Sequence, residues 1–214
     1  MIPGTSPRVF LFDLDGVLVD SRRSIENIWR RWAAARGRDP APFIAVCHGR
    51  RISETIAQVA PELDAKAEAA VLDRMEEVET DGVEPVAGAR DLLAGLAEGT
   101  WAVVTSGSRK VAMLRLTHVE LPIPKVFITA EDVRRGKPDP EGYLLAAARL
   151  GVEPKECVVI EDSAAGIAAG IAAGMRVIQV SPNRSSSPFD GAVRVIPTIS
   201  ALLTVLPKVP SNSI

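Results

Sequence analysis

The chain has 214 residues, of which 47% are hydrophobic and 24% charged, a composition typical of a globular protein and not of a disordered one. At about 150 residues per domain, this length predicts one domain, alone or with a smaller insert. Its 25 basic and 27 acidic residues nearly balance. No bulk positive field therefore favours nucleic acid or anionic lipid, and a bound phosphate must be held locally.

No segment of the sequence predicts a membrane span or a disulfide framework. The uncharged stretch 163–175 is mostly Ala and Gly and falls short of the roughly 18 apolar residues that indicate a transmembrane helix. The apolar run Val9–Phe12 is interrupted by Asp13, so no signal peptide is expected. Cys47 and Cys157 lie in unlike segments, and we expect both to be buried free thiols. A cytoplasmic protein is the expectation.

The first third of the chain predicts one strand followed by helices. Val9–Phe12 is a short apolar run, typical of a strand buried on both faces. From Ser21, apolar residues at helical spacing predict an amphipathic helix that ends near Gly37, and a second helical pattern runs over 63–78. Because no convincing strand lies within 20–85, this segment is expected to be an all-helical insert.

Strands and helices alternate in the rest of the chain. In order, the patterns predict helix 88–97, strand 101–104, a helix from 108, strand 126–128, helix 140–150, strand 157–160, helix 163–173, strand 177–180, a polar loop through 185–188, strand 193–196 and a final helix. Repeated strand–helix units predict an α/β fold with a Rossmann-like parallel sheet covered by helices. Ligands of such sheets bind beyond the carboxyl ends of the strands.

Two helices carry additional local signals. Both ends of helix 140–150 are marked by the sequence, with Asp139 as N-cap, Pro140 at the first helical position and Gly151 just past the end. Gly166 and Gly170 lie four residues apart and place small residues on one helix face. This pattern predicts close packing against the sheet.

Four acidic residues stand at the ends of two predicted buried strands: Asp13, Asp15, Glu161 and Asp162. Desolvation and mutual repulsion raise the pKa values of clustered buried carboxyls, so such a cluster needs a compensating cation. Mg²⁺ binds oxygen ligands and typically takes one or two carboxylates together with a substrate phosphate. The cluster therefore predicts a metal and a phosphate together. The alternative is that these residues are helix N-caps and solvated loop acids.

Three further residues could bind an anion such as phosphate. Thr105 and Ser106 follow strand 101–104 and precede a helix, so a hydroxyl and backbone N–H groups can meet phosphate oxygens. Helix capping is the common alternative for such a pair. Lys137 lies between Gly136 and Pro138, which fix the backbone around it and favour a directed ammonium over a solvated one.

Four segments occur in a characteristic order: Asp13–Ser21 (DLDGVLVDS), Val104–Gly107 (VTSG), Gly136–Pro138 (GKP) and Ile160–Asp162 (IED). They resemble the motifs of the haloacid dehalogenase superfamily, and the resemblance covers nearly the whole chain. The helical insert is similar in position and type to the cap of one subgroup. The resemblance implies a catalytic core at 1–19 and 86–214 and a helical cap domain at 20–85.

The resemblance also implies roles for the motif residues. Asp13 would attack phosphorus and become an aspartyl-phosphate, and Asp15 would act as general acid and base. The implied Mg²⁺ ligands are Asp13, the Asp15 carbonyl, Asp162 and, directly or through water, Glu161. The implied phosphate-binding residues are Thr105, the Ser106 amide and Lys137.

Two positions differ from related proteins and bear on which reaction we expect. Superfamily dehalogenases lack an acid two residues after the nucleophile, and the presence of Asp15 disfavours carbon–halogen cleavage. Mutases of the beta-phosphoglucomutase type carry a cap histidine where this chain has Ile25, which favours hydrolysis and leaves the mutase as the alternative. A non-catalytic binding protein would be expected to have lost Asp13, Asp15 or Lys137.

The cap segment His48-Gly49-Arg50-Arg51 resembles that of small sugar and polyol phosphatases, such as those acting on 2-deoxyglucose 6-phosphate or glycerol 3-phosphate. The resemblance implies substrate contact; the alternative is a solvated cap surface. We expect a magnesium-dependent phosphatase for a small phosphorylated metabolite. We expect it to be a monomer with no nucleic-acid or membrane partner.

Overall fold

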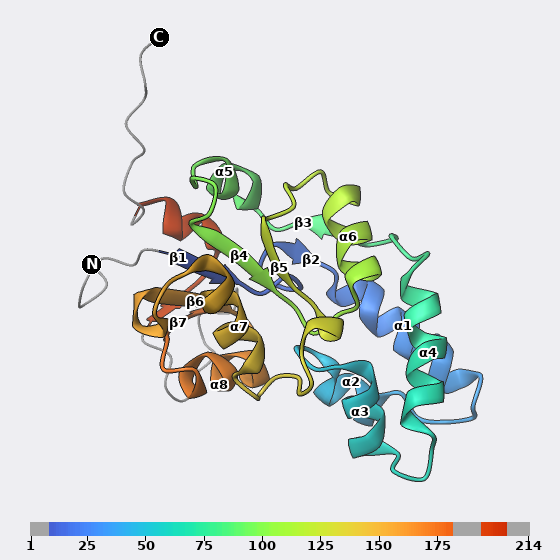
Figure 1. Cartoon of the computed structure of the whole chain (residues 1–214). Helices are drawn as coiled ribbons and strands as arrows, with labels where there is room; N and C mark the ends of the chain where they lie inside the picture. The colour runs from blue at the N-terminus through green and yellow to red at the C-terminus, as the bar shows by residue number, and fades with distance from the viewer. Residues whose placement is uncertain (1–8, 182–193, 205–214) are drawn as a thin grey trace.

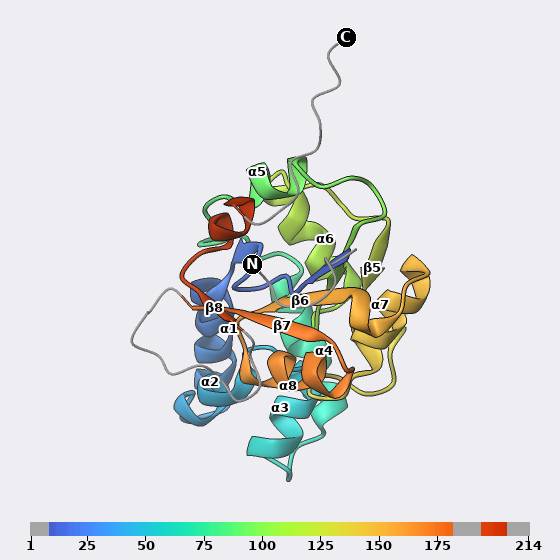
Figure 2. The same ribbon diagram turned by 90° about the vertical axis from the view of Figure 1, so that its left-hand side faces the viewer.

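The computed structural model describes residues 9–181 and 194–204. Its central feature is a parallel sheet of six strands: β1 (Val9–Phe12), β4 (Trp101–Val104), β5 (Val126–Ile128), β6 (Cys157–Glu161), β7 (Arg176–Val180) and β8 (Arg194–Ile196). The strand order is β5-β4-β1-β6-β7-β8; β4 and β5 lie side by side in Figure 1, and β7 and β8 in Figure 2. The first strand is central and pairs in parallel with β4 and β6. The predicted α/β fold is confirmed.

Helices cover both faces of the sheet (Figure 2). They are α5 (Ala89–Ala94), α6 (Arg109–His118), α7 (Glu141–Leu150) and α8 (Ala164–Ala172), with 3₁₀ turns η1 (Ala130–Asp132), η2 (Pro154–Glu156) and η3 (Ile199–Thr204). Alternate residues of a strand face opposite sides. Phe10 and Phe12 accordingly pack with α5, α6 and η3, whereas Val9 and Leu11 pack with α7 and α8.

Three details differ from the sequence-based prediction or lie beyond it. Helix α7 begins at Glu141, so Asp139 is not its N-cap, although Asp139 Oδ1 still accepts a hydrogen bond from the Glu141 amide. The predicted final helix is a 3₁₀ turn, η3, in the described part of the chain. The polar loop 185–188 lies outside the described residues.

The small-residue face of α8 packs against the sheet as predicted. A Cβ added at Gly170 would come within 2.8 Å of Val177 and 3.2 Å of Val159, on β7 and β6. A larger residue would therefore push the helix away from β6, the strand that ends in Glu161, and from the adjacent β7.

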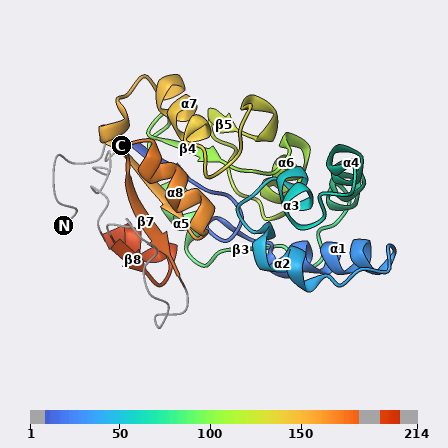
Figure 3. The same ribbon diagram turned by 90° about the horizontal axis from the view of Figure 1, so that it is seen from below.

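Four helices form a separate layer at one end of the sheet, the cap (Figure 3). They are α1 (Arg22–Ala34), α2 (Ala41–Cys47), α3 (Ile52–Val59) and α4 (Ala65–Glu76). The chain enters the cap through β2 (Val19–Asp20) and leaves it through β3 (Glu84–Pro85), and these two strands pair antiparallel. The cap is thus joined to the sheet by one short ribbon.

The cap has an aromatic core of its own. Trp29 and Trp32 are each 1% exposed, and both rings pack on Phe43, with ring centroids 5.5 and 5.0 Å from it. Both tryptophans are therefore buried in the cap core. Cys47 and Cys157 are buried and free. No helix within 9–181 or 194–204 is long and apolar enough to cross a bilayer.

Candidate functional site

A cavity of about 290 Å³ lies between the cap and the carboxyl ends of the strands. The core residues that line it include Asp13, Asp15, Thr105, Ser106 and Asp162, and the cap contributes His48, Gly49, Arg50 and Arg51. Lys137 and Glu161 are buried directly beside Asp13. The structure thus brings the predicted site residues of all four motifs and of the cap to one place.

Lys137 connects two of the acidic residues. Its Nζ donates to Asp13 Oδ1 at 2.6 Å, to Glu161 Oε1 at 2.6 Å and to the Val104 carbonyl at 3.1 Å. Burial alone would lower the pKa of Lys137, but the adjacent Asp13 and Glu161 carboxylates outweigh burial and raise this pKa well above its ordinary value. The ammonium therefore stays charged next to Asp13.

Both carboxylate oxygens of Glu161 are occupied by protein donors. Oε1 accepts from Lys137 and from the Tyr143 hydroxyl at 3.0 Å. Oε2 accepts from the amides of Asp162 and Ser163 and from the Ser163 hydroxyl, at 2.9–3.0 Å. This geometry suits Glu161 to orienting Lys137. The sequence gives no signal for Tyr143, because a tyrosine in an amphipathic helix looks like an ordinary core residue.

The acidic cluster carries more negative charge than its neighbours offset. Ligand oxygens of Asp13, Glu161 and Asp162 lie within 4.8 Å of one another. Burial first, and then the Glu161 charge, raise the pKa of Asp13 well above its usual range and the pKa of Asp162 to about 7. Lys137 is the buried cation among them. A divalent cation bound by carboxylate oxygens would remove this excess charge, so the donor set fits such an ion.

Thr105 and Ser106 lie where strand β4 ends, and neither caps the following helix. The N-cap of α6 is Ser108, whose Oγ accepts from the Val111 amide. Thr105 Oγ1 accepts from the Gly107 amide at 3.1 Å, and Ser106 Oγ donates to the Gly49 carbonyl at 2.9 Å. Helix capping therefore does not account for this pair, and both residues line the cavity.

Gly49 lets the cap loop approach the core. Its φ is +75°, a conformation that favours glycine, and an added Cβ would lie 2.1 Å from Ser163 Oγ. Its neighbour His48 has a buried Nε2 without a hydrogen-bond partner among the described residues. Burial, followed by the charge of Arg22, lowers the pKa of His48. The lowered pKa favours the neutral imidazole, although the Glu26 carboxylate lies 3.7 Å from Nε2.

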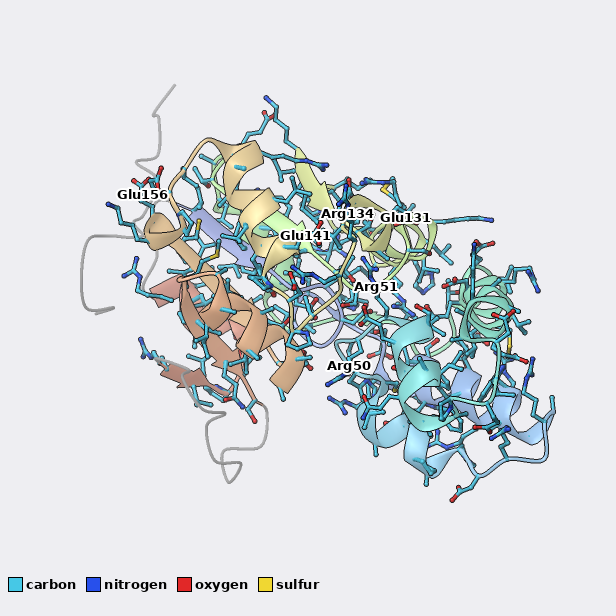
Figure 4. All side chains as sticks on the ribbon, turned by 60° about the horizontal axis from the view of Figure 1, so that its bottom comes forward. Arg50, Arg51, Glu131, Arg134, Glu141 and Glu156 are labelled. Carbon is cyan, nitrogen blue, oxygen red and sulfur yellow. The ribbon has the colours of Figure 1, made fainter. Side chains whose placement is uncertain are left out.

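Arg51 reaches from the cap to the core (Figure 4). Its guanidinium donates to the carbonyls of Ala130 at 2.8 Å, Val133 at 2.7 Å and Arg134 at 3.1 Å. Arg50, by contrast, bonds within the cap to Gln58 Oε1 at 3.2 Å. Of the two arginines predicted to contact substrate, Arg51 is thus engaged in holding the cap against the core.

A second contact extends this cap–core interface. Glu54, in the first turn of α3, accepts a hydrogen bond at its Oε1 from the Gly136 amide at 3.0 Å. Gly136 immediately precedes Lys137. The cap therefore touches the backbone segment that carries the buried ammonium.

We expect Arg51→Met to raise KM about tenfold with a smaller change in kcat. Lost hydrogen bonds of a charged donor cost about 1.5–3 kcal/mol, and a weaker closed form lowers apparent affinity in proportion to its population. Steady-state kinetics would measure both constants. Arg38→Met is the matched control, because Arg38 pairs at 2.7 Å with Glu62 inside the cap. Equal KM values in the two variants would contradict a closing role for Arg51.

Comparison with known proteins places the chain in a family. The family model for haloacid dehalogenase-like hydrolases matches residues 7–174. Hexitol phosphatase A of Escherichia coli is 46% identical over 176 residues, covering 80% of this chain and 82% of the relative. Glycerol-1-phosphate phosphohydrolase 2 of Saccharomyces cerevisiae is 37% identical over 189 residues, covering 79% and 73%.

The fold has close structural neighbours as well. A hydrolase from Pseudomonas syringae superposes with a TM-score of 0.81 at 26% identity, covering 92% of this chain and 96% of that structure. The family match and the similarity to these relatives account for the helical cap, the parallel sheet and the ordered motifs together. The protein belongs to the haloacid dehalogenase-like hydrolases.

Proposed function

We propose that the protein is a magnesium-dependent phosphatase that hydrolyses a small sugar or polyol phosphate through an aspartyl-phosphate on Asp13. One observation carries the proposal: Asp13 lines the cavity while its Oδ1 lies 2.6 Å from Lys137 Nζ. A carboxylate with a fixed ammonium beside it is suited to accept a phosphoryl group, because the cation offsets the added negative charge.

The phosphate-binding groups surround this nucleophile. Lys137, the Thr105 hydroxyl and the Ser106 amide would meet the phosphate oxygens as Asp13 attacks phosphorus. Charge stabilisation and positioning of this kind supply most of the acceleration in phosphoryl transfer. Asp15 would protonate the departing alcohol and then take a proton from the water that hydrolyses the aspartyl-phosphate.

Asp13, Asp162 and the Asp15 carbonyl would hold Mg²⁺. The ion supplies neutralisation of charge between the nucleophile and the phosphate. Because protein donors occupy both oxygens of Glu161, we assign Glu161 to holding Lys137 rather than to contacting the ion. The excess of buried carboxylates and the raised pKa of Asp162 support this arrangement.

The cavity and the relatives support an alcohol rich in hydroxyl groups. His48 lines the cavity and its lowered pKa favours the neutral imidazole, which would suit an uncharged polar substrate. The relatives named above act on phosphates of hexitols and glycerol. Ile25 lines the cavity where the mutases carry a histidine, which favours hydrolysis over rearrangement. A cytoplasmic location, a monomeric state and the lack of nucleic-acid partners stay predictions.

A panel of phosphate esters assayed with Mg²⁺ tests this proposal. We expect steady phosphate release from hexitol and glycerol phosphates, loss of activity with EDTA, and strong inhibition when Ca²⁺ replaces Mg²⁺, because the larger ion has irregular coordination.

Asp162→Asn should abolish the rise in melting temperature caused by Mg²⁺. A rearranged phosphosugar without free phosphate would instead identify a mutase.

A further inference from the structure

We propose that Arg115 positions the general acid Asp15 and that Glu76 links this pair to the cap. The inference rests on the proposed function, because it concerns proton transfer to the leaving alcohol. Neither Arg115 nor Glu76 belongs to a motif that the sequence singles out.

The three residues form a chain of charges in which Arg115 and Glu76 are buried and Asp15 is partly exposed. Arg115, on α6, is 3% exposed; its Nη1 donates to Asp15 Oδ1 at 2.8 Å, and its Nη2 lies 3.4 Å from Glu76 Oε2. Glu76 is also buried, at the last position of cap helix α4. A buried guanidinium needs carboxylate partners, and here one comes from the site and the other from the cap.

The hydrogen bonds fall on only one oxygen of Asp15. Oδ1 accepts from Arg115 Nη1 and from the Ser21 hydroxyl at 2.5 Å. Within the described part of the chain, no protein donor is recorded for Oδ2, and Asp15 lines the cavity with 21% of its side chain exposed. Two donors thus fix the rotation of the carboxyl group and leave Oδ2 to carry the catalytic proton.

This arrangement matches the step in which the alcohol leaves. The Asp13 oxygen forms a bond to phosphorus, the bond from phosphorus to the ester oxygen breaks, and the ester oxygen keeps the electron pair. It then takes the proton from Asp15 Oδ2, so Asp15 becomes a carboxylate that Arg115 stabilises. Arg115 touches neither phosphorus nor the ester oxygen in this scheme; it is a positioning residue.

Glu76 extends the arrangement across the domain boundary. Its carboxylate, at the end of cap helix α4, reaches Arg115 on core helix α6. A second pair joins the same two regions on the surface, where Lys110 Nζ lies 2.6 Å from Glu77 Oε2. The surface pair offers a control, since it links cap and core without contacting Asp15.

The test compares two esters of similar shape, phenyl phosphate and p-nitrophenyl phosphate, with Mg²⁺ present. Phenol is the poorer leaving group and needs the proton more. We expect Arg115→Met to lower kcat/KM for phenyl phosphate by about 100-fold, the contribution of a well-placed acid, and to affect p-nitrophenyl phosphate far less. Lys110→Met should leave the ratio of the two kcat/KM values unchanged.

Equal losses for both esters in Arg115→Met, in a variant that keeps its fold by circular dichroism, would overturn the positioning role. If that variant does not fold, Arg115→Lys and Glu76→Gln take its place, because each weakens the bridge while keeping polar partners. Both variants must then lower kcat/KM for phenyl phosphate more than for p-nitrophenyl phosphate, and an unchanged ratio of the two values in either variant refutes the inference. A wild-type protein that releases phosphate neither from these two esters nor from hexitol and glycerol phosphates contradicts the proposed function itself.

Discussion

Asp13→Asn is expected to lower phosphate release on the order of 10⁴-fold or more, because loss of a covalent nucleophile leaves only binding and electrostatic effects. The amide can neither attack phosphorus nor form the acyl-phosphate. Phosphate release with Mg²⁺ present, measured over hours, gives the residual rate.

The fold of this variant should survive. Burial and the Glu161 charge raise the pKa of Asp13, so removing the Asp13 charge relieves repulsion in the metal-free protein. We therefore expect a melting temperature at least equal to that of the wild type when EDTA is present. Asp91→Asn, at an exposed position on α5, is the matched control and should retain full activity. Wild-type turnover by Asp13→Asn would exclude the proposed mechanism.

Lys137→Met is expected to abolish activity and to destabilise the metal-free fold. Removing one partner of a buried ion pair costs about 3–5 kcal/mol, because Asp13 and Glu161 would then face each other without the ammonium that lies 2.6 Å from each. Chemical denaturation in EDTA would measure the change in unfolding free energy.

The double variant Lys137→Met/Glu161→Gln distinguishes the effect of Lys137 on stability, through charge balance, from its effect on activity. The added amide removes one negative charge from the cluster and keeps hydrogen-bonding groups near Tyr143 and Ser163. We expect part of the lost stability to return, while activity stays absent because the phosphate still lacks its ammonium. Stability that is no better in the double variant than in Lys137→Met would show that repulsion between Asp13 and Glu161 is not the cause.

The core of the site could be predicted from the sequence because its residues follow apolar runs. The predicted bounds of β1, β4 and β5 equal those in the structure, since a short run of buried residues ending in a polar one marks a strand end. The carboxyl ends of parallel strands then meet at one edge of the sheet. The bounds of α2 and α3 cannot be read from the sequence, because helices of seven and eight residues are too short to show a clear periodicity.

The contacts between cap and core could not be predicted. Arg115 meets Glu76 across 39 positions of the chain, and no local spacing marks either residue. Arg51 was expected to contact substrate because of its neighbours in the sequence, but its guanidinium binds three core carbonyls. Such pairings depend on how two separately packed layers meet, which no single segment encodes.

The ribbon of β2 and β3 determines how the cap can move. Both chain crossings lie in this pair, in which Val19 pairs with Pro85 and Asp20 with Glu84. Two adjacent crossings would form a hinge that lets the cap rotate about one axis and restricts sliding, once the contacts of Arg51, Glu54 and Glu76 with the core are released. Val19 also forms a bridge with Asp15, which places the acid at the pivot. Opening the cap to admit a substrate would therefore displace Asp15 little, and a cycle of swings would return the same proton donor to the same place.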